Sequence, residues 1–93
     1  MLVSITCGVI KNSTTHIKGM ASVMLDNLVV INGIKIIQSK KGDYFVGMPS
    51  QKSSKGIFSD VAYLKDSTKR EQLDKAILET FFNKSTIVNN YEI

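Results

Sequence analysis

The chain has 93 residues, 43% of them hydrophobic, which fits one small globular domain and not a disordered segment. Twelve basic and eight acidic side chains give a net charge of +4, which is compatible with a nucleic-acid partner without establishing one. A single cysteine and a single histidine exclude an intramolecular disulfide and the usual zinc sites, and nothing in the sequence indicates a cofactor or a small-molecule substrate.

The sequence predicts a cytoplasmic protein that does not enter a membrane. No apolar run approaches the roughly 20 residues that cross a bilayer. The segment Met1–Val3 lacks the basic region of a signal peptide.

Two half-buried strands are predicted first. Apolar side chains occupy alternate positions from Val3 to Val9 and again from Ile17 to Leu25, and this period of two is typical of strands. Residues 11–15 between them have turn chemistry, and Asp26–Asn27 is a tight-turn pair that can bond its own backbone. We therefore expect these strands and the next one to form an antiparallel meander.

Residues 28–37 (LVVINGIKII) allow two interpretations. The pair Asn32–Gly33 is a strong hairpin signal that would divide the run into two very short strands. Alternatively, the run is one long strand with a bulge at Gly33. The later apolar run Tyr44–Met48 predicts a short buried strand, which Pro49 ends because proline has no N–H for a sheet ladder.

A basic loop follows this strand. Residues 50–56 are polar, rich in serine, and include Lys52 and Lys55. The apolar pattern resumes at Ile57 and continues to Tyr63. The sequence thus predicts two strands joined by a basic loop that projects from a rigid sheet.

A helix is predicted from about Thr68 to Phe82, because the apolar residues there change to helical spacing. Ser67 or Thr68 can cap its start, and the segment Thr68–Glu71 fits a capping box. Residues 84–93 have no clear period, so they are either a frayed end or an additional strand.

The predicted strands carry more apolar surface than one helix can cover. Segments 28–31, 34–37 and 44–48 are apolar on both faces, as in strands that are covered on both sides or paired with another chain. A homodimer is the simplest way to cover the second face. The expected fold is therefore α+β, with an antiparallel sheet of about five strands, one C-terminal helix, and a dimeric assembly.

The chain offers few groups for catalysis. Cys7 lies on the apolar face of the first strand and is expected to be a buried structural thiol. His16 precedes the second strand and is expected to be solvated. Asp26 and Asp43 fit turn and capping roles, and Asp60 is expected to accept hydrogen bonds from backbone N–H groups at the base of the loop. Without a nucleophile–base pair or a metal set, we expect no enzyme.

Three blocks of this sequence resemble the SpoVG family of bacterial septation and sporulation regulators. Residues 45–50 (FVGMPS) are similar to the family's FVAMPS, residues 21–26 (ASVMLD) to ASVTLD, and residues 56–62 (GIFSDVA) to GEFRDIA. The blocks occur in the family's order and nearly its spacing, which implies one domain of this kind over residues 1–83. The resemblance also implies that residues 28–37 form one long strand and that the protein is dimeric.

The resemblance implies a function in nucleic-acid binding, because SpoVG proteins bind DNA, and in some cases RNA, partly through basic residues after their MPS motif. In this chain Gln51 stands at the first basic position and Lys52 keeps the second. Ser53 stands for a threonine, Lys55 for an acid, and Ser59 for an arginine. The family's charge pattern is thus only partly kept, which puts its sequence preference in doubt here.

The basic residues also follow the loop into the helix. Lys65, Lys69 and Arg70 lie near the helix start, where cations oppose the helix dipole and are better explained by bound phosphates. Arg70 also matches an arginine of the family. The expected function is that of a nucleic-acid-binding regulator of septation, sporulation or gene expression, and the alternative is a protein-interaction adaptor whose basic loop docks an acidic partner. The residues expected to contact nucleic acid are Gln51, Lys52, Ser53, Lys55, Lys69 and Arg70.

Overall fold

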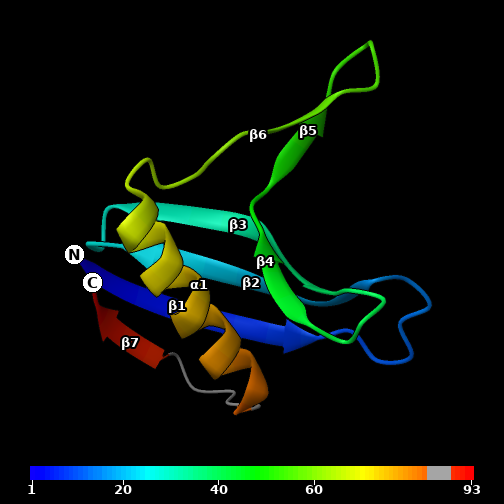
Figure 1. Cartoon of the computed structure of the whole chain (residues 1–93). Coiled ribbons are helices and arrows are strands. Elements are labelled where there is room, and N and C mark those ends of the chain that lie inside the picture. Colours follow the sequence, from blue (N-terminus) through cyan, green and yellow to red (C-terminus); the bar gives the residue numbers. More distant parts are fainter. Residues whose placement is uncertain (84–88) are drawn as a thin grey trace.

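The computed structural model describes residues 1–83 and 89–93, and these form one helix and seven antiparallel strands. Figure 1 shows the helix across one face of a curved sheet, and a hairpin that projects away from both. This confirms the predicted α+β class. The elements in chain order are β1 (Leu2–Val9), β2 (Ile17–Leu25), β3 (Val29–Gln38), β4 (Tyr44–Gly47), β5 (Ser50–Lys52), β6 (Phe58–Asp60), α1 (Ser67–Phe82) and β7 (Asn89–Glu92).

The main sheet has five strands in the order β4-β3-β2-β1-β7, and β5 and β6 form a separate two-stranded sheet. The fifth strand of the main sheet therefore comes from the C-terminal segment and not from residues 57–63. The strand predicted after the basic loop is confirmed for Phe58–Asp60 (β6), and the apolar pattern from Val61 to Tyr63 does not continue it. Val61 and Tyr63 lie beyond this strand and are exposed.

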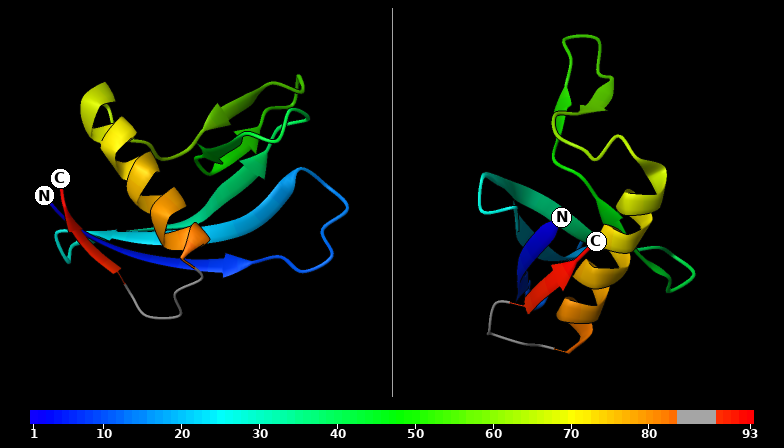
Figure 2. Two further views of the ribbon diagram at one scale, coloured as in Figure 1. Left: turned by 60° about the horizontal axis from the view of Figure 1, so that its bottom comes forward. Right: turned by 90° about the vertical axis from the view of Figure 1, so that its left-hand side faces the viewer.

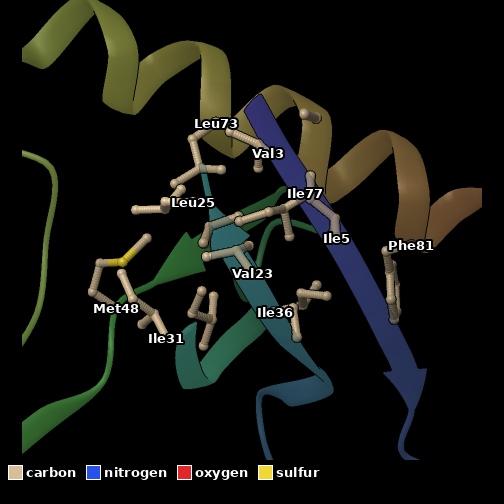
Figure 3. Close-up of a cluster of buried hydrophobic side chains, with 14 residues drawn as sticks. Val3, Ile5, Val23, Leu25, Ile31, Ile36, Met48, Leu73, Ile77 and Phe81 are labelled. Atoms are coloured by element: carbon tan, nitrogen blue, oxygen red, sulfur yellow. The ribbon is translucent and has the colours of Figure 1, made fainter. Parts of the chain in front are cut away.

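The core lies between the helix and the inner face of the main sheet (Figure 3). Val3 and Ile5 of β1 point toward Leu73 and Ile77 of α1, and all four side chains are almost completely buried. The predicted alternation is confirmed at Val3 and Ile5 of β1 and from Gly19 to Leu25 of β2, whereas Val9 at the end of β1 is exposed. Figure 2 shows that the opposite face of the sheet has no covering layer among the described residues.

The long third strand is confirmed, and it is bulged. Ala21 pairs with Ile34 and Val23 with Ile31, so three residue steps along β3 match two along β2. The extra residue falls beside Gly33, whose φ of +77° lies in the left-handed region that glycine adopts without a steric penalty. The strong hairpin signal at residues 32–33 thus makes a bulge inside a continuous strand.

The helix start differs from the prediction. Asp66 is the N-cap, and its carboxylate accepts a hydrogen bond from the backbone N–H of Lys69 at 3.0 Å. Neither Ser67 nor Thr68 caps the helix, and the predicted capping box does not form. Aspartate is as good an N-cap as serine, and a lysine at the third helical position cannot return the hydrogen bond that a box needs.

The C-terminal segment supplies an edge strand. Asn89–Glu92 pairs with β1, with Val3 opposite Tyr91. Of the two alternatives for residues 84–93, the additional strand is therefore observed for residues 89–92, and residues 84–88 lie outside the described part. Among the described residues, no helix is long and apolar enough to cross a membrane.

Candidate nucleic-acid interface

The predicted basic loop is a projecting β-hairpin. Strands β5 and β6 pair with Ser50 opposite Asp60, Gln51 opposite Ser59, and Lys52 opposite Phe58. Every residue from 51 to 61 is exposed. The hairpin departs from the sheet at Pro49, whose carbonyl oxygen accepts a hydrogen bond from Val61 N–H at 2.8 Å and so closes its base. Pairing therefore starts at Ser50, and the loop is shorter than predicted.

The turn of the hairpin is held by Ser53. Its backbone N–H donates to the Ile57 carbonyl at 2.8 Å, and its hydroxyl accepts from the backbone N–H groups of Lys55 and Ile57. Gly56, in the same turn, has a φ of +82°, in the left-handed region that glycine adopts without a steric penalty. Ser53 thus shapes the turn that presents Lys55, and its direct contact with nucleic acid stays a prediction.

The two faces of the hairpin carry different chemistry. Successive residues of a strand point to opposite faces, so Lys52 shares a face with Phe58, and Gln51 shares the other with Ser59. The Lys52 ammonium lies 5.8 Å from the centre of the Phe58 ring, within the range of a cation–π contact. Lys52 and Gln51 were predicted together as site residues, but their side chains point to opposite faces of the hairpin.

The lysines of the hairpin have no acidic partner in the described part of the chain. The ion pairs recorded there are Arg70–Asp74 at 2.8 Å and Lys75–Glu71 at 4.0 Å, both within the helix. Lys52 and Lys55 are exposed, and neither enters an ion pair among these residues. Their charge is thus available to an external anion.

The basic residues of the helix start are not brought beside the hairpin. In Figures 1 and 2 the hairpin points away from the first turn of α1. Lys69 is exposed, and its ammonium donates to the carbonyl oxygen of Ile93 at 3.2 Å. The predicted contact of Lys69 with nucleic acid would therefore involve a second part of the surface.

Arg70 is half-buried and already engaged. Its Nε donates to the Asp74 carboxylate at 2.8 Å, and one Nη donates to the Val46 carbonyl of β4 at 3.2 Å. Burial raises the pKa of Asp74, and the hydrogen bond and charge of Arg70 oppose that rise. Arg70 therefore ties the helix to the strand that leads into the hairpin, and its contact with phosphate stays a prediction.

Further titratable candidates from the sequence are Cys7, His16 and Asp60. Cys7 is half-buried and not fully buried as predicted, and its thiol lies 3.7 Å from the Ile77 carbonyl oxygen. Burial raises the pKa of this thiol to about 11, which favours the protonated form at neutral pH. His16 is exposed, and its Nδ1 lies 2.9 Å from the Gln38 carbonyl oxygen. No hydrogen bond from the described residues reaches the Asp60 carboxylate, so the prediction that it accepts from backbone N–H groups is wrong. The base of the hairpin is closed by backbone groups instead.

The second face of the main sheet carries exposed apolar side chains. Met20, Val30 and Phe45 are exposed on three neighbouring strands, and Leu28, in the turn before β3, is 85% exposed. Strand β3 pairs with β4 only over residues 35–38, so residues 29–34 have no strand on that edge within the described part. The structure thus locates uncovered apolar surface where the sequence predicted it.

Comparisons with known proteins agree on one family. The SpoVG family model matches residues 2–83. A septation protein SpoVG of Phytoplasma australiense is 34% identical over 79 residues, which cover 85% of this chain and 78% of that protein. The protein of the same name from Caldanaerobacter subterraneus subsp. tengcongensis is 40% identical over 70 residues, covering 75% and 76%. One from Clostridium perfringens is 41% identical over 64 residues, covering 69% and 70%.

Proposed function

The chain belongs to the SpoVG family, and from this premise we propose that it is a nucleic-acid-binding regulator of septation or gene expression. One observation carries the proposal: an exposed hairpin presents two lysines that have no acidic partner among the described residues. An exposed ribbon with unpaired cations fits a phosphate backbone, which binds proteins chiefly through charge. The proposed role involves no catalysis.

In this proposal the phosphates are bound by Lys52 and Lys55. Lys52 lies in β5 and Lys55 in the turn, so both cations lie in the outer part of the hairpin. Gln51 offers an amide donor and acceptor on the opposite face, where it can contact a base edge when the ribbon enters a groove. Lys69 would add a weaker, separate contact at the helix start, and Arg70 chiefly positions the base of the hairpin.

Single substitutions of the two hairpin lysines test the proposal. Lys52→Ala or Lys55→Ala is expected to weaken binding to a generic duplex by about tenfold or more at low salt, because each removes a phosphate contact. The free energy of unfolding should change by less than about 0.5 kcal/mol, because both side chains are exposed. Fluorescence anisotropy titration and urea denaturation measure the two effects.

Lys40→Ala provides a matched control for these variants. Lys40 is an exposed lysine in the turn between β3 and β4, away from the hairpin (Figure 1). It should keep most of the wild-type affinity. Equal losses in all three variants would mean that only net charge matters, and a parallel loss of stability would mean that the hairpin lysines are structural.

We also propose that the regulator acts as a homodimer, which places two hairpins on one particle. The uncovered sheet face with Met20, Val30 and Phe45, and the open edge at residues 29–34, support a second copy there. Light scattering at micromolar concentration should therefore give about twice the mass of one chain. A single-chain mass at high concentration would refute the dimer and leave the binding proposal to stand on one hairpin.

A further inference from the structure

The Phe58 ring is exposed on a hairpin that has no core of its own. It is 64% exposed and lies opposite Lys52 in the register of β5 and β6. The aromatic cluster of the described residues is formed elsewhere, by Tyr44, Phe81 and Phe82. Packing within the chain therefore does not explain a phenylalanine at this position.

We propose that Phe58 is a stacking platform for an unpaired base, and that the hairpin therefore prefers single-stranded to duplex nucleic acid. The inference rests on the proposed function and names its substrate class. Exposed aromatic rings beside cations bind single strands, because every base has a flat π-face and every phosphate a charge. A paired base inside a duplex is already stacked on both sides and cannot reach the ring.

The groups around the ring determine where a strand can pass. The Lys52 ammonium, 5.8 Å from the ring centre, can bind a phosphate next to the stacked base. Lys55 in the turn can bind another. Ser50 and Asp60 lie on the same face nearer the sheet, where the exposed Asp60 carboxylate repels phosphate. The strand should therefore cross the outer part of the hairpin.

The same charges disfavour burial of the ring against a second copy of the chain. Covering Phe58 with protein would also bury the Lys52 ammonium, which has no acidic partner among the described residues. An unpaired buried charge is strongly unfavourable. A nucleotide covers the ring and supplies an anion at the same time.

The test compares a labelled oligothymidine of about 15 nucleotides with its duplex, using fluorescence anisotropy at one salt concentration. The wild-type protein should bind the single strand at least about fivefold more tightly. Phe58→Leu keeps an apolar side chain without a flat ring and should weaken single-strand binding about tenfold, with less than about twofold change for the duplex. Phe58→Tyr should retain the wild-type preference.

Ser59→Ala is the control on the opposite face of the hairpin, at an exposed residue without charge, and should leave the affinity for oligothymidine unchanged. The stacking inference is overturned if wild type shows no single-strand preference, if Phe58→Leu binds like wild type, or if Phe58→Tyr loses as much as Phe58→Leu. It is also overturned if Phe58→Leu halves the mass in light scattering, because the ring would then pack against a second copy. In these cases, binding that still depends on Lys52 preserves the proposed function, whereas no binding to either probe refutes that function itself.

Discussion

Replacing Gly19 by alanine is expected to lower the free energy of unfolding by about 2–4 kcal/mol. A Cβ at this buried position would lie 2.5 Å from Cε1 of Phe81 and 2.8 Å from the carbonyl oxygen of Gly8. Neither neighbour can move freely. The Phe81 ring is packed against Tyr44 and Phe82, and the Gly8 oxygen belongs to the backbone of β1, which pairs with β2.

Gly8→Ala is the matched control, because the same atom is added on the neighbouring strand. No heavy atom of the described residues lies within 4 Å of a Cβ at Gly8, and the position is exposed. This variant should unfold within about 0.5 kcal/mol of wild type in urea denaturation. Similar unfolding midpoints for the two variants would show that the last turn of α1 is not packed closely on β2 as described here.

The regular strands and the helix were predictable because each buries one face, so apolar residues recur in the sequence with the period of that element. Val3 and Ile5 alternate with polar residues, and Leu73 and Ile77 have helical spacing, so strands and helix followed from the sequence alone. The bulge at Gly33 is a different case. Asn32–Gly33 signals positive φ equally well in a hairpin and in a bulge, and pairing across the whole sheet decides between them.

The errors occurred where several local solutions have similar free energies. Asp66, Ser67 and Thr68 are all good N-cap residues, and the structure places the extended backbone of the cap at Asp66. The strand at residues 89–92 stayed an open alternative in the sequence because its partner lies 86 positions away in β1, and the period of a short segment does not reveal so distant a pairing.

The candidate site was predicted as a set of residues but not as a surface. Lys52 and Lys55 were identified from charge and position, and both are exposed on the hairpin. Gln51 and Lys52 are neighbours in a strand, so their side chains point to opposite faces once residues 50–52 are recognised as that strand. The pairing of Lys52 with Phe58 depends on the register that the five-residue turn sets, and the anchoring of Arg70 depends on the distant Val46 carbonyl.

The salt dependence of binding is expected to show the largest effect on function. If each subunit neutralises about two phosphates, a dimer neutralises about four, and log affinity for duplex DNA should fall against log salt with a slope of about −3.6. Raising salt from 50 to 200 mM should then weaken binding about a hundredfold. The effect is large because the release of counterions adds over every contact.

The most direct test of the phosphate-binding hairpin is this salt series, measured for wild type, Lys52→Ala and Gln51→Ala. The Lys52→Ala dimer lacks two contacts, so its slope should flatten to about −1.8. Gln51→Ala removes no charge, so it should keep the wild-type slope and change only the preference among sequences. A wild-type slope near zero would contradict phosphate binding by the hairpin and would favour the alternative of an adaptor that docks an acidic protein.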